Sequence, residues 1–259
     1  MGTVAKALSL LDHFTQQRPE IGLSDLARLS GLNKATAYRL LTELQAAGFV
    51  EQAAAGRAYR LGPEVLRLAA LREAAVPILS ASRPVLEHVS RVTGETAHLS
   101  LVRGARLTAL THVYSPQHAT RVMMDDAEIL PFHATGSGLA VLAFAAEEFV
   151  ETVLAGPLAA FTEATQTDPT QLRAALGHVR RSGIAEAVGG FERDVHSHAA
   201  PVFDATGAPL GALAVAAPVA RMTPQARALI RAELARAARD LTRSLGGTCP
   251  PGFPREDAA

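Results

Sequence analysis

The stretch LARLSGLNKATAYRLLTELQAAGFV, residues 26–50, decides the fold of the N-terminal part of the chain. Gly31 separates two apolar segments within it, because glycine ends a helix in the left-handed conformation without a Cβ clash. Ser24 can cap the first helix and Asn33 the second. The second segment has the i, i+3, i+4, i+7 spacing of one buried helical face, with Ala37, Leu40, Leu41 and Leu44. Two helices joined by a glycine turn predict a helix-turn-helix, although two core helices of any α domain share this pattern.

A hairpin pattern follows and favours the helix-turn-helix. Residues 49–52 and 58–61 alternate between apolar and polar as strands do, and the small residues 53–56 between them are turn-prone. Arg57 would lie at the tip of this hairpin and Arg60 on its return strand. A helix, a helix-turn-helix and a basic hairpin together predict a winged helix, whose wing would place Arg57 against a phosphate or the minor groove.

The second helix keeps polar residues off its buried face, where they can meet DNA. We expect Lys34 and Arg39, with Arg57 of the wing, to hold phosphates, and Asn33 and Thr36 to touch bases. Tyr38 also points away from the buried face. Few of these side chains are bidentate base readers, so part of the specificity should come from DNA shape. The same residues argue against a winged helix that only binds other proteins.

The length and charge of the chain indicate how many domains it has and how it could bind DNA. A chain of 259 residues predicts two domains. The formal net charge is zero, and residues 24–60 are only modestly basic, so attraction to DNA must be local. One weakly basic module binds DNA poorly at physiological salt, which favours a dimer.

The cysteine content and hydropathy favour a cytoplasmic protein with no membrane partner. Cys249 is the single cysteine, so the sequence predicts no intrachain disulfide and fits a reducing compartment. The N-terminus lacks a basic and apolar signal pattern, and no apolar run reaches transmembrane length. No cofactor motif is evident.

The rest of the chain predicts an α+β architecture. Pro63 should begin a helix that runs to about Leu79 and packs on a partner chain, although an ordinary core helix would have the same pattern. Strands and helices then intermix up to a long terminal helix capped by Thr223. The predicted parts are a winged helix-turn-helix domain (1–62), a linker helix (63–82), an effector-binding domain (83–247) and a disordered tail (248–259).

Three sequence blocks in this order resemble the IclR family of bacterial transcription regulators. They are GLNKATAYRLLTELQAAGFVE at 31–51, PFHATGSGLAVLAF at 131–144 and HAAPVFDATGAPLGALAVAAPVARMT at 198–223. The resemblance covers roughly residues 3–247. It implies an N-terminal winged helix and a C-terminal GAF-like domain that binds a small organic effector. It also implies a homodimer or dimer of dimers on a pseudo-palindromic operator in double-stranded DNA.

The resemblance also implies an effector pocket beside a glycine-rich helix start. By position, its residues would be Leu130, Gly136, Ser137, Val195, Ser197, Ala214 and Ala216. Independently of the family, the unpaired N–H groups and the positive dipole end of a helix that starts with Gly136-Ser137-Gly138 can bind a carboxylate. The alternative is that these small residues only allow close packing of helix and strand.

Departures from the family pattern bear on the effector. An acidic cluster usually precedes the strand of Ser197, but here the sequence reads Ala187-Val188-Gly189-Gly190. Ser197 stands where cysteine is frequent, and Ala214 and Ala216 stand where some members are polar. Because a buried, unpaired polar group costs about 1–3 kcal/mol, a pocket with few polar groups favours a larger, more apolar effector, such as an aromatic or fatty acid.

Two other functions compete. His196 and His198 share one face of a strand, and with His112, His118 or His133 they could form a metal site that serves the pocket. However, no HExxH or cysteine pair anchors such a site. A hydrolase using Ser137 and His133 would need a nucleophile elbow and an acid partner, and the sequence has no GxSxG. We therefore expect no resident metal and no enzymatic activity.

Overall fold

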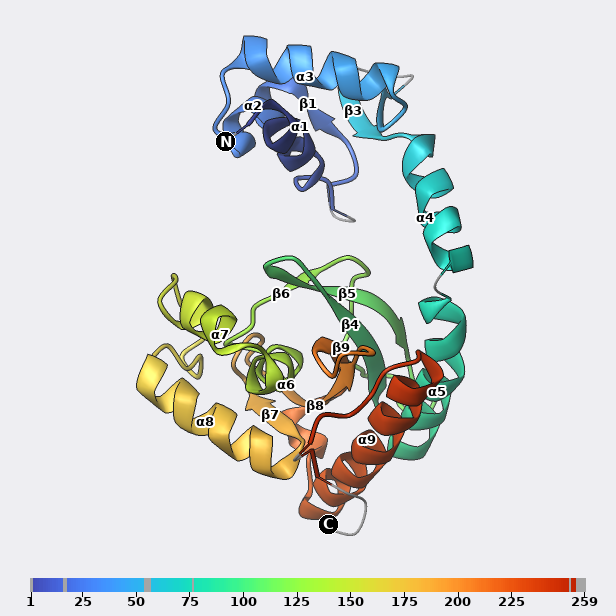
Figure 1. The fold of residues 1–259 in the computed structure, drawn as a ribbon, viewed down its shortest axis with the longest axis vertical. Helices are drawn as coiled ribbons and strands as arrows, with labels where there is room; N and C mark the ends of the chain where they lie inside the picture. The colour runs from blue at the N-terminus through green and yellow to red at the C-terminus, as the bar shows by residue number, and fades with distance from the viewer. Residues whose placement is uncertain (1, 16–17, 54–56, 76, 252, 255–259) are drawn as a thin grey trace. The chain divides into compact units, whose positions relative to one another are not determined.

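The computed structural model describes residues 2–15, 18–53, 57–75, 77–251 and 253–254, and its ribbon is coloured along the chain in Figure 1. These residues divide into two compact units, one ending at Pro77 and the other beginning at Ile78. Each unit contains its own apolar core.

The first unit contains the predicted helix-turn-helix. After α1 (Thr3–Leu11), helices α2 (Leu23–Ser30) and α3 (Lys34–Ala46) are joined at Gly31, which ends α2 at a φ of 68°. The Asn33 side chain caps α3 by accepting a hydrogen bond from the Thr36 N–H at 2.8 Å. Ser24 does not cap α2, because the helix already begins at Leu23 and Gly22 occupies the N-cap position.

The wing is a three-stranded antiparallel sheet in the order β1-β3-β2. The hairpin strands β2 (Val50–Gln52) and β3 (Ala58–Leu61) match the prediction, and β1 (Ile21–Gly22) pairs with β3. Of the predicted turn residues, 54–56 lie outside the described residues. The predicted buried face of α3 packs with α1, α2 and the sheet in a core that includes Leu10, Ile21, Leu26, Leu40, Leu41, Leu44, Val50 and Tyr59.

The predicted linker is two helices rather than one. Helix α4 (Pro63–Ala75) belongs to the first unit, and α5 (Ile78–Thr93) begins the second. Pro77 lies between them. Proline lacks the N–H that would continue a helix, which fits a boundary at this position.

The second unit is built on a six-stranded antiparallel sheet in the order β6-β5-β4-β9-β8-β7. Its central strands are β4 (Thr96–Arg103), β9 (Pro209–Pro218) and β8 (Val195–Phe203). Toward the edges lie β5 (Arg106–Val113), β6 (Ile129–Leu130) and β7 (Ala185–Val188). Strand β6 has only two residues.

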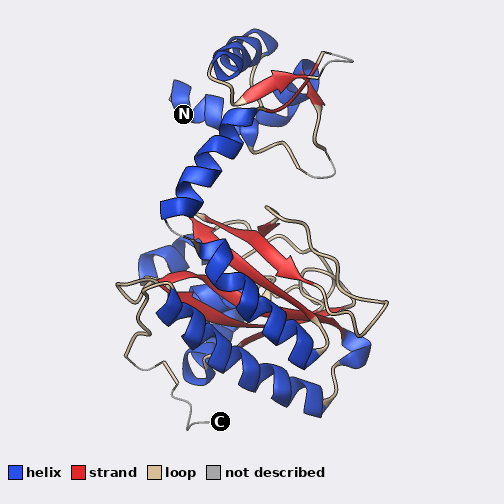
Figure 2. Ribbon diagram, turned by 90° about the vertical axis from the view of Figure 1, so that its right-hand side faces the viewer, coloured by secondary structure: helices blue, strands red, loops and turns tan. Residues whose placement is uncertain are grey.

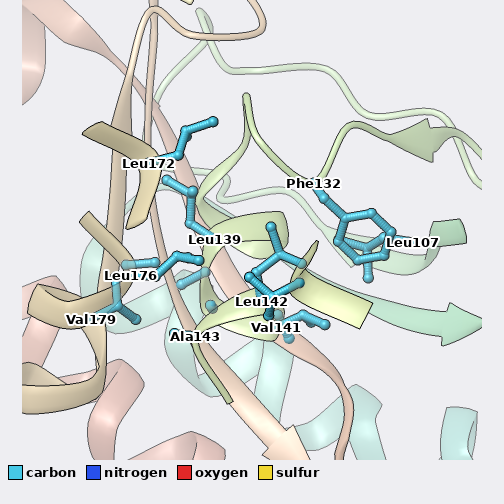
Figure 3. Close-up of a cluster of buried hydrophobic side chains, with 14 of the residues drawn as sticks. Leu107, Phe132, Leu139, Val141, Leu142, Ala143, Leu172, Leu176 and Val179 are labelled. Carbon is cyan, nitrogen blue, oxygen red and sulfur yellow. The ribbon is translucent and has the colours of Figure 1, made fainter. Parts of the chain in front are cut away.

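Helices cover both faces of this sheet (Figures 1 and 2). Helices α5 and α9 (Pro224–Ser244) pack together on one face, and α6 (Gly136–Phe144) packs on the other. Figure 3 shows α6 between the sheet and α8 (Pro169–Ser182), where Leu139 and Leu142 lie among buried side chains such as Leu172 and Leu176. The remaining helices are α7 (Glu147–Leu154) and the short η1 (Val219–Arg221).

Of the predicted disordered tail, residues 248–251 and 253–254 are described and contact the second unit, whereas 252 and 255–259 lie outside the described residues. Phe253 is buried and packs edge-on against Phe144 and Phe203, with ring centroids 5.5 and 5.2 Å apart. The Thr248 N–H donates to the carbonyl of Asp204, and Arg239 donates to the carbonyl of Pro254. One aromatic anchor and two hydrogen bonds therefore order a segment whose composition predicted a loose end. Among the described residues, none of the helices is long and apolar enough to cross a membrane.

Candidate functional site

A groove in the first unit brings the recognition helix and the wing together. Lys34 and Tyr38 of α3 line it from one side, and Gln52, Arg57 and Tyr59 of the hairpin line it from the other. The tight turn at Gly31 and the cap at Asn33 set the start of α3, so Lys34 and Tyr38 emerge one helical turn apart on the same side. The groove thus offers two cationic side chains and an exposed phenol, a combination suited to a phosphate backbone.

The predicted DNA contacts are mostly exposed. Lys34, Arg39 and Arg57 are exposed, and 56% of the Tyr38 surface is accessible. Thr36 is half-buried. The carbonyl oxygen of the Asn33 side chain is used in capping α3, so this residue keeps its amide N–H groups for a ligand.

Arg60, the second basic residue of the predicted hairpin, is engaged within the protein. Its guanidinium lies 2.7 Å from Glu51 on the paired strand and 3.8 Å from Glu20. Two carboxylates therefore offset its charge. Arg57 is the hairpin arginine that lines the groove.

The second unit contains a small pocket between α6 and the sheet. Its volume is about 40 Å³, room for about three water molecules. Five of the seven predicted effector residues line it: Leu130, Ser137, Val195, Ser197 and Ala216. Gly136 borders the pocket through a backbone hydrogen bond to Ser197, whereas Ala214 is fully buried in the apolar core.

The N-terminus of α6 offers fewer free N–H groups than the sequence predicts. The Gly136 N–H donates to the Ser197 hydroxyl at 3.1 Å, and the Gly138 N–H donates to the capping Thr135 hydroxyl at 3.0 Å. Of the N–H groups of Gly136, Ser137 and Gly138, that of Ser137 has no acceptor among the described residues. An anion bound here would therefore meet one free N–H and the Ser137 hydroxyl.

His98 is a pocket residue that the sequence reasoning missed. It lies on β4, is 4% exposed, and its Nε2 lies 3.2 Å from the Ser137 hydroxyl. Burial, with the nearby His112, lowers the pKa of His98 to about 4, so the ring is neutral near pH 7. Its Nδ1 is buried without a hydrogen-bond partner in the described part of the chain. A buried polar atom of this kind is rare, and the residue that carries it lines the pocket.

Two carboxyl groups also line the pocket and were not predicted. Burial raises the pKa of Glu128, as do the charges of Glu192 and Asp125, and burial raises the pKa of Glu192. Both lie outside the strands in irregular segments, where no sequence periodicity marks them. The pocket is therefore not as poor in polar groups as the sequence suggested, and its twelve lining residues include no lysine or arginine.

The hydrolase arrangement is not assembled. His133 bonds the carbonyl of Ala159 at 2.9 Å, and Ser137 is paired with His98 instead. Because the second ring nitrogen of His98 has no carboxylate partner among the described residues, Ser137 lacks the acid that completes a catalytic triad.

The histidines proposed for a metal site also separate. His112 pairs with Asp126 at 2.9 Å, and His133 bonds the carbonyl of Ala159. His196 and His198 instead lie beside Glu186 of β7. Since Ser197 between them points toward α6, the two histidines point to the opposite face of the sheet, away from the pocket.

Comparison with known proteins accounts for both units. The model of the C-terminal domain of the bacterial transcriptional regulator IclR matches residues 72–243, and the IclR helix-turn-helix model matches residues 3–54. The chain is similar to a glycerol operon regulatory protein of Streptomyces griseus, at 32% identity over 248 residues, covering 94% of this chain and 96% of that protein.

Solved structures show the same similarity over the whole chain. An IclR-type regulator from Silicibacter sp. is 61% identical with a TM-score of 0.94, covering 98% of this chain and 100% of that chain. An IclR homolog from Microbacterium hydrocarbonoxydans, complexed with 4-hydroxybenzoate, is 27% identical with a TM-score of 0.77, covering 94% and 99%.

Proposed function

Because the chain belongs to the IclR family of bacterial transcriptional regulators and is not an enzyme, we propose that it binds a pseudo-palindromic operator and that a small organic effector controls this binding. The observation that carries the DNA half is the groove in which Lys34 and Tyr38 of α3 meet Arg57 of the wing. Helix α3 enters the major groove, and the wing follows the adjacent backbone or minor groove.

Arg39 tests the electrostatic part of this proposal. It is exposed on α3 and would neutralise one phosphate, so Arg39→Ala should weaken binding to all DNA sequences and lower the salt slope by about 1. The measurement is fluorescence anisotropy with labelled genomic fragments over a range of salt concentrations. Arg181→Ala, in α8 of the second unit, is the matched control. An unchanged slope for Arg39→Ala would refute its phosphate contact.

A dimer supplies the second recognition helix. Helix α4 exposes three leucines, with Leu66 74%, Leu68 40% and Leu71 57% accessible. Apolar side chains grouped on one exposed helix favour an interface. We assign this surface to a second copy of the chain, because a single module with so few cations binds DNA weakly. A dimer of dimers would be built from the same unit.

The effector half rests on the pocket beside α6. The His98 ring, the Ser137 N–H and the Ser197 hydroxyl supply hydrogen-bonding groups, while Leu130, Phe191 and Ala216 supply apolar surface. This mixture suits an aromatic acid or phenol, the class to which the 4-hydroxybenzoate of the Microbacterium homolog belongs. Since the cavity is only about 40 Å³, an aromatic ring enters only if lining side chains move.

Calorimetry with 4-hydroxybenzoate, acetate and lactate tests the effector class. We expect saturable binding of the aromatic acid and little heat from the two short acids. Ser137→Ala should weaken binding of the aromatic acid. Ser182 lies at the end of α8, so Ser182→Ala should leave this binding unchanged. Tight binding of acetate or lactate without binding of 4-hydroxybenzoate would overturn the assignment.

The effector changes DNA affinity by stabilising one arrangement of the dimer relative to another. A ligand can shift such an equilibrium only by binding one arrangement more tightly than the other. Helix α4 follows directly after the wing and carries the exposed leucines. We therefore propose that α4 transmits the change in dimer arrangement to the DNA-binding unit.

A further inference from the structure

Three side chains with metal-ligand chemistry converge on the sheet face opposite the effector pocket. Glu186 Oε1 of β7 lies 2.6 Å from His196 Nε2 and 3.5 Å from His198 Nε2 of β8. The two imidazole rings are stacked, with centroids 4.7 Å apart. One donor atom from each residue falls within 4.8 Å of the other two, so a small shift brings all three to about 2.0–2.2 Å from one cation.

His198 has no ordinary reason to be placed here. It is fully buried, and within the described part of the chain neither ring nitrogen has a hydrogen-bond partner. Imidazole is the commonest metal ligand in proteins and coordinates through one ring nitrogen.

An ion-pair network is the competing explanation. Arg227 of α9 lies 2.7 Å from Glu186 Oε1, the oxygen that also faces both histidines. This network satisfies Glu186 and His196, but within the described part of the chain it leaves both nitrogens of His198 without a hydrogen bond, with Nε2 3.5 Å from Glu186. The Arg227 side chain is 46% exposed, so it can swing into solvent when a cation takes its place.

We propose that Glu186, His196 and His198 form a binding site for a divalent metal ion of the zinc class. Two imidazole nitrogens and one carboxylate oxygen are a ligand set that zinc accepts, with a fourth position open to water. Alternate residues of β8 present both histidines on one face, whereas Ser197 between them faces the effector pocket. The site is independent of the proposed effector binding, but an ion here would fix the strand that carries Ser197.

Zinc calorimetry and cobalt absorption on the full, untagged, chelator-treated chain test the site. We expect one equivalent of Zn²⁺, and Co²⁺ should give the visible absorption of a tetrahedral centre. Loss of a second-shell partner typically costs 10–100-fold in metal affinity. His198→Ala and Glu186→Gln remove direct ligands, so each should weaken binding by at least about 100-fold.

Two further variants separate a metal site from an ion-pair network. Arg227→Ala removes the competing cation and should tighten Zn²⁺ binding, whereas loss of one arm of a simple ion-pair network would have no such effect. His112→Ala breaks another histidine–carboxylate pair and should leave binding unchanged. Absence of saturable binding, or equal affinities for the wild type and Glu186→Gln, would overturn the proposal. Glu186→Gln remains decisive if His198→Ala fails to fold, because Glu186 lies on an edge strand.

Discussion

Arg57 and Arg60 lie in the same wing but have different surroundings. Arg60 is paired with Glu51 and Glu20, whereas Arg57 lines the groove beside Lys34. Arg57→Ala should therefore weaken DNA binding and lower the salt slope by about 1, and Arg60→Ala should change the slope much less. Anisotropy titrations of both variants on one DNA fragment make the comparison. Equal losses would mean that the ion pairs of Arg60 open on DNA.

His98 makes stability depend on pH. Its pKa is about 4 in the folded chain against an ordinary value of 6.5, so between these pH values the unfolded state binds more protons. Stability should therefore fall as the pH drops from 6.5 toward 4. The difference between the two pKa values corresponds to about 3 kcal/mol of folding free energy.

His98→Gln removes this titration and keeps a side chain that can bond Ser137. Urea unfolding at several pH values should show a shallower loss of stability below pH 6.5 for the variant. Since His198 titrates equally in both proteins, the difference between the two slopes reports His98 alone. Parallel slopes would mean that the buried imidazole titrates normally.

At the residue scale, local chemistry was predictable and long-range contacts were not. The roles of Asn33 and Gly31 follow from helix ends, which depend on neighbouring residues. His98 meets Ser137 only because β4 and the start of α6 approach across 39 positions of sequence. Glu128 and Glu192 enter the pocket from irregular segments, which have no period to read.

Replacing either of two helical glycines by alanine should change stability in opposite directions. A Cβ at Gly138 would lie 2.3 Å from the Phe132 carbonyl oxygen, which is backbone and cannot easily move. Gly138→Ala should therefore destabilise the second unit by about 1–3 kcal/mol or more. A Cβ at Gly177 of α8 would meet its nearest neighbour, an arginine tip, at 3.7 Å. Gly177→Ala should stabilise by about 0.4–1 kcal/mol.

Thermal unfolding of the two variants checks this contrast. A neutral Gly138→Ala would mean that α6 shifts away from Phe132 without cost. The close approach to Phe132 gives this glycine a packing reason in addition to any role at the ligand.

At the element scale, periodic segments were predictable and short ones were not. The buried face of α3 and the hairpin strands β2 and β3 agree with the sequence pattern, because amphipathic or alternating runs define them. Strands β1 and β6 have two residues each, too few to show a period. The C-terminal segment around Phe253 is ordered by aromatic contacts with distant elements, which composition does not reveal.

At the scale of the whole molecule, the exposed leucines of α4 predict how the chain associates. Leu66→Glu with Leu71→Glu places charges on the proposed interface, so sedimentation should show a shift from dimer toward monomer. DNA affinity should fall with it, because two half-sites are no longer held together. Glu64→Gln, on the same helix, is the control. A double variant that remains dimeric would move the interface elsewhere.

The division into two units was predictable because each has its own apolar core and local pattern. The position of the boundary was not predicted. It falls at Pro77, whereas a continuous linker helix was expected across this position. Operator sequence and effector identity depend on partners outside the chain, so they need binding experiments.

Capture of genomic DNA fragments by the purified full chain, at two salt concentrations, tests the central claim most directly. Sequencing of the captured fragments should reveal a few pseudo-palindromic sites that persist at the higher salt, because base contacts add to the salt-sensitive phosphate contacts. A variant that combines Lys34→Ala, Arg39→Ala and Arg57→Ala should lose them. Capture that is blind to sequence and disappears at the higher salt would contradict operator recognition by the groove between α3 and the wing.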